Sequence, residues 1–325
     1  MTAAIHNWQP ADLTQHILAL DWQTPTRSPE LSTALSKYRQ FYGLPEPLDS
    51  GWASHHIGYE STAGYRIAVQ QWRHRHPTGN LMLVHGYYDH LGLYGSVVRF
   101  CEHHSLNLLA FDLPGHGLSG GPQAEIGHFG EYTDIFDHLF RQARRYWSGN
   151  WYAMGQSTGG AILASWLLQH RPTPGQNGPC SVALLAPLLK PAGWHIGRWL
   201  APAVAPFRKR LRRRFRHDGN TPDFSRFLEC HDPLQPHHLS VRWVLALAHW
   251  IPELESHPPL DYPVFLVQGE QDKTVAWRYN LPVYQRLFPQ LMTHVIPTAH
   301  HHLVNDTEAH QNEMYQWLSD HFVIR

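Results

Sequence analysis

The sequence predicts an α/β protein with a mostly parallel central sheet, flanked by helices and interrupted by an inserted, largely helical cap. From about residue 80, short apolar segments of strand length alternate with segments of helix length, which is typical of βαβ units. The alternation stops between about residues 188 and 258, in a stretch rich in Pro, Trp and Arg that is too long for a connecting loop. A chain of 325 residues is long enough for one large domain with such an insertion.

The first elements lie before the alternation begins. Residues 1–50 are expected to form a helical lead-in, because "LSTALSKYRQFYGL" repeats apolar or aromatic residues every three to four positions. A β-hairpin is expected next, since "SHHIGYES" and "YRIAVQQWR" alternate in polarity on either side of Thr62-Ala63-Gly64.

Six strands are then expected for the main sheet. They are Leu81–Val84, Leu106–Phe111, Trp151–Met154, Val182–Leu185, Val264–Val267 and His294–Ile296. The insertion separates the fourth from the fifth, so the predicted core comprises residues 1–187 and 259–325, and residues 188–258 are the cap. In an open α/β sheet such a cap is expected over the carboxyl ends of the strands.

The composition excludes several classes of protein. Hydrophobic residues make up 42% and charged residues 16% of the chain, and no run approaches the roughly 18 apolar residues of a membrane span. The N-terminal residues lack the basic start and the cleavage site of a secretory signal, so the expected location is the cytoplasm. The three cysteines are widely spaced, as is usual for reduced thiols.

Neither a metal nor a cofactor is expected. The chain has 27 histidines, but their clusters lack the helical i, i+4 pairing with a third acidic ligand that metal sites use. Nucleic acid is not an expected partner either, since a single basic run without a recognised binding fold is poor evidence for it.

The stretch "MGQSTGG" contains a G-x-S-x-G pentapeptide around Ser157. It follows the strand at Trp151–Met154 and precedes a helix over Ala161–His170, so Ser157 is expected at a sharp strand-to-helix turn. In this context the pentapeptide indicates a nucleophile elbow, in which flanking glycines permit a strained backbone. The alternative is that Ser157 caps the helix.

A nucleophilic serine needs a base, and the base needs an orienting carboxylate. On this fold the order along the chain is serine, acid, histidine. Asp272 follows the strand at Val264–Val267, and Glu270 is the rival acid, expected to flank the turn. Three histidines, 300–302, follow the last strand, and the residues alone leave open which one is the base.

These motifs resemble the α/β-hydrolase superfamily and, within it, the bacterial lysophospholipase and monoacylglycerol lipase group. The resemblance runs from about Leu81 to the C-terminus and rests on "LVHGYYDHLGLY", "FDLPGHGLSGG", "GQSTGG", "HDPL", "QGEQDKTV" and "AHHHLVND". The family's segment before its catalytic histidine is similar to Ala-x-His-x-Leu. The resemblance therefore implies that His301, 29 positions after Asp272, is the base.

Two backbone N–H groups are expected to bind the oxyanion. Thr158, directly after the nucleophile, supplies one, and resemblance to the family's His-Gly-x turn implies that Tyr87 supplies the other. His85 at the strand end is expected to be structural, and the resemblance assigns no chemistry to Asp112, His116 or Asp89-His90. The chain departs from the family at Gln156 and Thr158, where His and Met or Leu are frequent, and these departures bear on the acyl pocket.

The cap contains a basic run. Seven of the nine residues from Arg208 to Arg216 are basic and none is acidic, although the whole chain is neutral. Apolar residues recur at Val204, Phe207, Leu211 and Phe215, which predicts an amphipathic helix. Two uses stay open: peripheral contact of residues 207–216 with an anionic membrane, or ordinary packing within the cap.

The predicted protein is a serine ester hydrolase that forms an acyl-enzyme on Ser157 and uses no cofactor. The resemblance implies a small lipid substrate, a lysophospholipid or a monoacylglycerol. A short-chain carboxylesterase, thioesterase or perhydrolase of the same fold remains an alternative, as does a non-catalytic membrane-docking module. The acyl chain length, the headgroup and the oligomeric state stay open.

Overall fold

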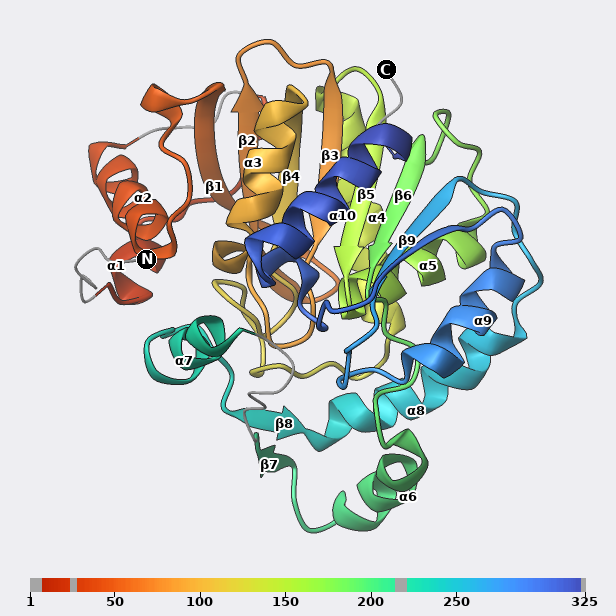
Figure 1. Ribbon diagram of the computed structural model, residues 1–325. Helices are drawn as coiled ribbons and strands as arrows, with labels where there is room; N and C mark the ends of the chain where they lie inside the picture. Colours follow the sequence, from red (N-terminus) through yellow and green to blue (C-terminus); the bar gives the residue numbers. More distant parts are fainter. Residues whose placement is uncertain (1–7, 24–27, 214–220, 323–325) are drawn as a thin grey trace.

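The computed structural model describes residues 8–23, 28–213 and 221–322 (Figure 1). In these residues the central sheet has eight strands. They are β1 (Trp52–Thr62), β2 (Tyr65–His74), β3 (Gly79–Val84), β4 (Leu106–Phe111), β5 (Trp151–Gln156), β6 (Ser181–Leu185), β9 (Val264–Gly269) and β10 (Met292–Ile296). Their order across the sheet is β1-β2-β4-β3-β5-β6-β9-β10.

The sheet is mostly parallel, which confirms the predicted fold class. Only β2 runs antiparallel to its neighbours, β1 and β4, and the other pairs are parallel. The hairpin of β1 and β2 turns where it was predicted, with Thr62 paired to Tyr65. The six predicted core strands are all present, and their ends differ from the predicted ends by at most two residues.

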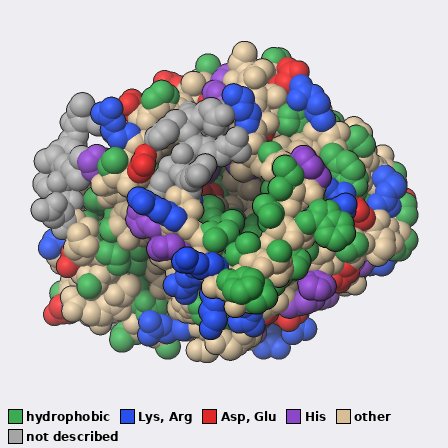
Figure 2. Space-filling model, turned by 90° about the horizontal axis from the view of Figure 1, so that it is seen from below, with side chains coloured by type: hydrophobic (Ala, Val, Ile, Leu, Met, Phe, Trp, Pro, Cys, Tyr) green, Lys and Arg blue, Asp and Glu red, His purple; other side chains and the backbone are tan. Residues whose placement is uncertain are grey.

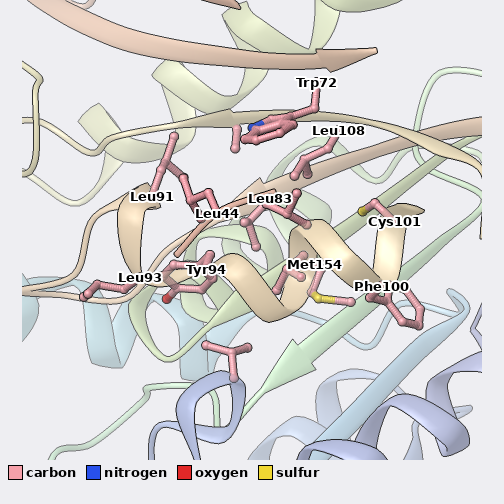
Figure 3. Close-up of a cluster of buried hydrophobic side chains, with 14 of the residues drawn as sticks. Leu44, Trp72, Leu83, Leu91, Leu93, Tyr94, Phe100, Cys101, Leu108 and Met154 are labelled. Carbon is pink, nitrogen blue, oxygen red and sulfur yellow. The ribbon is translucent and has the colours of Figure 1, made fainter. Parts of the chain in front are cut away.

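Helices cover both faces of the sheet, because its strands are apolar on both sides. Leu81 and Leu83 of β3 face the same hydrophobic cluster as helices α3 (Gly95–His103) and α10 (Glu308–His321), part of which is drawn in Figure 3. Met82 and Val84 face a second cluster with α4 (Gly130–Tyr146), α5 (Thr158–His170) and α9 (Trp277–Leu287). This burial on both faces is usual for parallel strands.

The predicted helical lead-in is present next to β1 (Figure 1). Its main helix is α2 (Pro29–Tyr42), which Ser28 caps by accepting a hydrogen bond from the Leu31 amide. Gly43 ends it in the left-handed conformation, with φ of 65°. The short elements are α1 (Ala11–Thr14) and the 3₁₀ turns η1 (Pro47–Asp49), η2 (Leu91–Leu93) and η3 (Leu303–Asn305).

The stretch between β6 and β9 leaves the sheet, and residues 188–258 are called the inserted segment below. Its described elements lie together beyond the ends of the parallel strands, at the bottom of Figure 1. They are α6 (Trp194–Val204), β7 (Arg210–Arg212), α7 (Pro222–Cys230), β8 (His238–Ser240) and α8 (Val241–Ser256). Strands β7 and β8 pair antiparallel.

The amphipathic helix predicted from Val204 onward is wrong as far as the structure describes it. Val204 ends α6, and Arg210–Arg212 is the strand β7; Phe215 and the rest of the run to Arg216 lie outside the described residues. Pro206, two residues after the end of α6, has no N–H to donate to a helical hydrogen bond. A helix would also place Arg208 and Arg212 four positions apart on one face, where like charges repel.

Among the described helices, none combines the length and the hydropathy needed to cross a bilayer.

Candidate active site

Three of the predicted site residues meet at the carboxyl ends of neighbouring parallel strands. Ser157 follows β5, Asp272 lies in the loop after β9, and His301 follows β10. Strands β5, β6, β9 and β10 are consecutive in the sheet, so their carboxyl ends open toward the same edge. The structure thereby brings together side chains that are up to 144 positions apart.

Ser157 occupies a strained turn that its glycine neighbours make possible. Its backbone has φ of 53° and ψ of −112°, values that residues with a side chain rarely adopt. A Cβ on Gly159 would lie 2.0 Å from the carbonyl oxygen of Val84, and one on Gly155 would lie 2.4 Å from the carbonyl carbon of Gly159. Only glycine at both positions allows α5 to approach the sheet this closely, as the nucleophile elbow requires.

The Ser157 hydroxyl does not cap α5 but bonds the base expected for it. Its Oγ lies 3.0 Å from Nε2 of His301, and Nδ1 of His301 lies 2.7 Å from Oδ2 of Asp272. The side chain of His302 faces elsewhere, with Nε2 3.0 Å from Oδ2 of Asp89. His300 donates its backbone amide to Asp306, which also faces its ring. Of the three histidines, His301 is therefore the one in contact with Ser157.

Asp272 is held as a carboxylate by its surroundings. Its Oδ1 accepts the amides of Thr274 and Val275 at 2.7 and 3.1 Å, and Oδ2 accepts Nε2 of Gln268 at 3.0 Å. Burial acts to raise the pKa of Asp272, but the adjacent His301 and these hydrogen bonds outweigh it, so the pKa lies below its ordinary value.

The same pair sets the protonation of the base. Burial acts to lower the pKa of His301, but the charge of Asp272 and its hydrogen bond outweigh burial, and the pKa lies above its ordinary value. The rival acid does not take part in this pair. The side chain of Glu270 is 41% exposed and lies 3.6 Å from Arg278.

The two amides expected to bind an oxyanion lie beside Ser157. Thr158 is the first residue of α5, and Tyr87 lies in the loop after β3, next to Gly86. A Cβ on Gly86 would be 3.4 Å from Cβ of Ser157, so this loop runs close to the serine. Within the described residues, neither amide donates a hydrogen bond to another group.

Gln156 has a role that the sequence did not indicate. It was expected to bear on the acyl pocket, but its Nε2 donates to the carbonyl oxygen of His301 at 2.9 Å. The buried amide thereby connects the residue before the nucleophile to the backbone of the base. No sequence signal could have revealed this contact, because it depends on how closely the loop after β10 approaches β5.

The residues expected to be structural are buried and hydrogen-bonded to main-chain or side-chain groups. His85 is fully buried, and burial lowers its pKa to about 3, so its neutral ring accepts the Leu113 amide on Nε2 at 2.8 Å. Asp112 accepts the amides of Leu91 and Leu118, each at 2.8 Å. Asp89 accepts Tyr94 Oη at 2.8 Å in addition to its contact with His302.

In the described part of the chain, no group of three or more His, Cys, Asp or Glu side chains is placed to hold a metal ion.

Seen from the side of the inserted segment, the surface has a hollow with hydrophobic side chains along part of its border (Figure 2). A serine with a base, a carboxylate and two free amides can attack a carbonyl carbon and stabilise the negative oxygen that results.

The model of the family described as serine aminopeptidase, S33, matches residues 75–308. Among curated proteins, phospholipase YtpA of Bacillus subtilis (strain 168) is 26% identical over 100 residues, which is 31% of this chain and 38% of that protein. A monoacylglycerol lipase of Mycolicibacterium smegmatis is 32% identical over 82 residues, 25% of this chain and 29% of that protein. The matches thus span less than two fifths of each curated relative.

Solved structures share the fold over most of the chain. A soluble variant of monoglyceride lipase from Saccharomyces cerevisiae, in complex with a substrate analogue, has a TM-score of 0.72 at 16% identity and covers 86% of this chain and 98% of its own. Monoacylglycerol lipase of Paleococcus ferrophilus has a TM-score of 0.66 at 20% identity, with 78% and 99% covered. These findings confirm the α/β-hydrolase fold and the resemblance to its lipase-like group.

Proposed function

The chain belongs to the family described as serine aminopeptidase, S33, and from that premise we propose that it is a serine hydrolase that cleaves carboxylic esters through an acyl-enzyme. The observation that carries the proposal is the chain of contacts from Ser157 Oγ through His301 to Asp272, at 3.0 and 2.7 Å. A serine whose hydroxyl contacts a histidine, which in turn contacts a carboxylate, has the base that it needs to act as a nucleophile at neutral pH.

In the proposed mechanism, His301 takes the proton from Ser157 as Oγ attacks the ester carbonyl. The resulting oxyanion accepts hydrogen bonds from the backbone N–H groups of Tyr87 and Thr158, and the Asp272 carboxylate stabilises the imidazolium. The imidazolium then protonates the departing alcohol, which leaves the acyl group on Ser157. Water enters, gives a proton to His301 and attacks the acyl carbon, and collapse of the second tetrahedral intermediate releases the acid and restores the Ser157 hydroxyl.

The proposed substrate class is a monoacylglycerol or a lysophospholipid. Two observations support it: the printed names of the curated relatives, a phospholipase and a monoacylglycerol lipase, and the hollow with hydrophobic side chains along part of its border (Figure 2). The inserted segment is proposed to be the cap over this site, with residues 188–258 as its bounds. A short-chain carboxylesterase, a thioesterase or a perhydrolase remains the alternative activity for the same machinery.

A substrate screen tests both the activity and the class. Purified protein and its Ser157→Ala variant are assayed on monoacylglycerols, lysophospholipids, short p-nitrophenyl esters and an aminoacyl p-nitroanilide. We expect ester hydrolysis by the wild type, with long-chain lipids preferred. The variant should lose fluorophosphonate labelling and about 10⁴- to 10⁶-fold in hydrolysis. Cleavage of the anilide alone would overturn the ester assignment, and labelling of the variant would overturn Ser157.

We also propose a peripheral membrane contact, through a surface that differs from the predicted helix. Four large apolar side chains are exposed on α6 and just after it: Ile196, Trp199, Leu200 and Phe207. The two aromatic ones, Trp199 and Phe207, are 70% and 83% exposed. Five exposed basic residues lie in the same segment: Arg198, Arg208, Lys209, Arg210 and Arg212. No acidic residue occurs between positions 194 and 213. Figure 2 shows Lys and Arg side chains beside hydrophobic ones on this face.

Such a surface is complementary to an anionic bilayer. The apolar side chains can enter the acyl region while the cations face the phosphates, each basic residue contributing about 1 kcal/mol. This surface would bring the site close to lipid substrates.

Vesicle co-sedimentation tests the contact. Wild-type protein should pellet with phosphatidylserine-containing vesicles at low salt and less so at high salt, since surface charges are screened within about 8–10 Å. Replacing Arg208, Arg210 and Arg212 with Gln should weaken the salt-sensitive part of binding, because three of the five exposed cations are removed. Replacing Trp199 and Phe207 with Ser should weaken the part that does not depend on salt. Arg99, Arg141 and Arg145, also exposed, provide a matched triple replacement that should bind normally. Wild-type protein left in the supernatant at low salt would contradict the proposal.

A further inference from the structure

The turn that carries Tyr87 is held by side chains of the inserted segment. The ring of Tyr87 stacks on that of Trp243, near the start of α8, with 3.8 Å between centroids and 18° between planes. The guanidinium of Arg213, just after β7, lies 4.0 Å from the ring centroid of Tyr88. Two adjacent residues of the turn are thus each covered by a different element of the inserted segment.

Both contacts are anchored at their far ends. The backbone amide of Trp243 donates to Ser240 Oγ at 3.2 Å, and that hydroxyl donates to Glu125 Oε2 at 3.1 Å. Arg213 Nη1 donates to Gln235 Oε1 at 2.8 Å and to the carbonyl of Pro236 at 3.2 Å. The aromatic and cationic groups that cover the turn therefore have fixed positions relative to α8 and β8.

The turn itself needs such support. Tyr88 has φ of 74°, a conformation that a tyrosine adopts only where its surroundings enforce it. On the other side, the Gly86 amide donates to Tyr94 Oη at 3.0 Å, and Tyr87 Oη donates to the carbonyl of Ala124 at 2.8 Å. The Tyr87 amide lies between a residue fixed by the core and a residue fixed by the inserted segment.

We propose that Trp243 and Arg213 are positioning residues for the Tyr87 amide, an inference that rests on the proposed function. Neither contacts the reacting atoms. They hold Tyr87 and Tyr88 so that the amide points to the place where the oxyanion forms, and the site is complete only when the inserted segment is seated on the turn. Because the oxyanion exists only in the transition state and the intermediates, loss of either contact should lower kcat and leave KM nearly unchanged.

Kinetics on a soluble short ester test this inference. Trp243→Leu and Arg213→Met should each lower kcat by about 10- to 100-fold, as expected when a catalytic group is displaced by up to about 1 Å, with KM within about threefold of wild type. Trp243→Phe, which keeps an aromatic face over Tyr87, should restore most of kcat. Arg226→Met is the matched control, since Arg226 lies in the same inserted segment and is exposed, and it should behave as wild type.

A double-mutant cycle separates positioning from a general loss of structure. If Trp243 acts through the stack, Tyr87→Leu and Trp243→Leu together should lower kcat no further than the stronger single variant. Thermal melts of all variants identify any that fail to fold. If Trp243→Leu fails to fold, the inference is tested with Arg213→Met and Trp243→Phe instead.

The outcomes are distinguishable. Wild-type kcat in both Trp243→Leu and Arg213→Met, with active wild-type protein, overturns the inference and leaves the proposed function intact. A rise in KM at unchanged kcat also overturns it, because it would mean that these residues bind substrate. Wild-type protein that neither hydrolyses esters nor reacts with a fluorophosphonate would instead contradict the proposed function.

Discussion

Three consecutive histidines follow β10, and each has a different neighbour. His301 faces Ser157, His302 faces Asp89, and His300 faces Asp306. His301→Ala should therefore abolish hydrolysis, whereas His300→Ala and His302→Ala should each retain a substantial fraction, because only one imidazole reaches the serine at hydrogen-bond distance. Steady-state rates of the three purified variants check this. An inactive His300→Ala protein beside an active His301→Ala protein would show that the assignment is wrong.

The pH dependence should report the raised pKa of His301. His301 acts as a base only when neutral, so kcat/KM should fall as the pH drops through this pKa. Because the pKa is raised, the fall should begin at a higher pH than it would for an isolated histidine, whose pKa is near 6.5. Asp272→Asn removes the charge that raises the pKa. Its acid limb should move to lower pH while the plateau falls by about 10⁴-fold. An acid limb that does not move would mean that Asp272 does not set the pKa.

At the level of single residues, the sequence was informative where chemistry imposes an order along the chain. Ser157 and Asp272 were predicted because each follows a strand and carries the required type of side chain, whereas His301 was chosen among three consecutive histidines by the resemblance to the family. Trp243 and Arg213 were not assigned to the site, and the contact of Gln156 with His301 was not foreseen, because these contacts depend on loops and on the inserted segment meeting in three dimensions. The local sequence does not specify such contacts.

At the level of elements, the junction of β5 and α5 depends on close backbone approach. A methyl group on Gly159 would collide with the main chain of Val84, which cannot give way without moving β3. Gly159→Ala should therefore destabilise the fold by at least about 1–3 kcal/mol, the usual cost of overpacking. Urea unfolding measures the change.

Gly197 provides the control, because it lies inside α6 with only the edge of the Trp194 ring within 4 Å. Gly197→Ala should be neutral or stabilise the protein by up to about 1 kcal/mol, since Ala favours helix. Equal effects of the two substitutions would show that the close approach at Gly159 has no special cost.

The elements that could be predicted are those whose burial repeats along the chain. The strands of the sheet are continuous apolar runs, and all six core strands were found from that pattern. The basic run was misread, because an apolar spacing of three to four fits a helix even where a proline and neighbouring like charges prevent one. Strand β7 forms instead against β8, 28 positions away, and local spacing carries no information about that partner.

At the level of the whole molecule, one buried cluster ties three segments together. Asp232, in the inserted segment, accepts Nε2 of His90 at 2.9 Å and Oη of Tyr42 at 2.8 Å. His90 belongs to the loop after β3 and Tyr42 to the end of α2. The sequence motif "HDPL" marked this aspartate, but its partners are 142 and 190 positions away and could not be named.

Asp232→Ala should destabilise the protein by about 3–5 kcal/mol, because it leaves His90 buried without its counter-charge. Tyr42→Phe, which removes a single hydrogen bond, should cost about 1 kcal/mol. Chemical denaturation of both variants checks the order. Equal losses would mean that the His90–Asp232 pair contributes no more than an ordinary hydrogen bond.

The pH dependence of this stability has a defined sign. Burial opposes charge on both groups, but their attraction outweighs it, so the pKa of His90 is raised and that of Asp232 is lowered. The contribution of His90 is complete below its ordinary pKa near 6.5 and is lost as pH rises through the raised value; that of Asp232 is lost as pH falls through its lowered value. The advantage of wild type over Asp232→Ala should therefore shrink in alkaline buffer.

The positive φ of Ser157 lowers the stability of the fold, while the serine at this position is required for activity. A glycine there would adopt φ of 53° and ψ of −112° without the penalty that a Cβ incurs, so Ser157→Gly should yield a protein that is inert yet melts at a higher temperature than the active one. Evolution toward thermal resistance would then favour loss of the nucleophile, and only demand for the reaction would retain it. Calorimetry of the two proteins compares them directly, and a lower melting temperature for Ser157→Gly would show that the turn is unstrained.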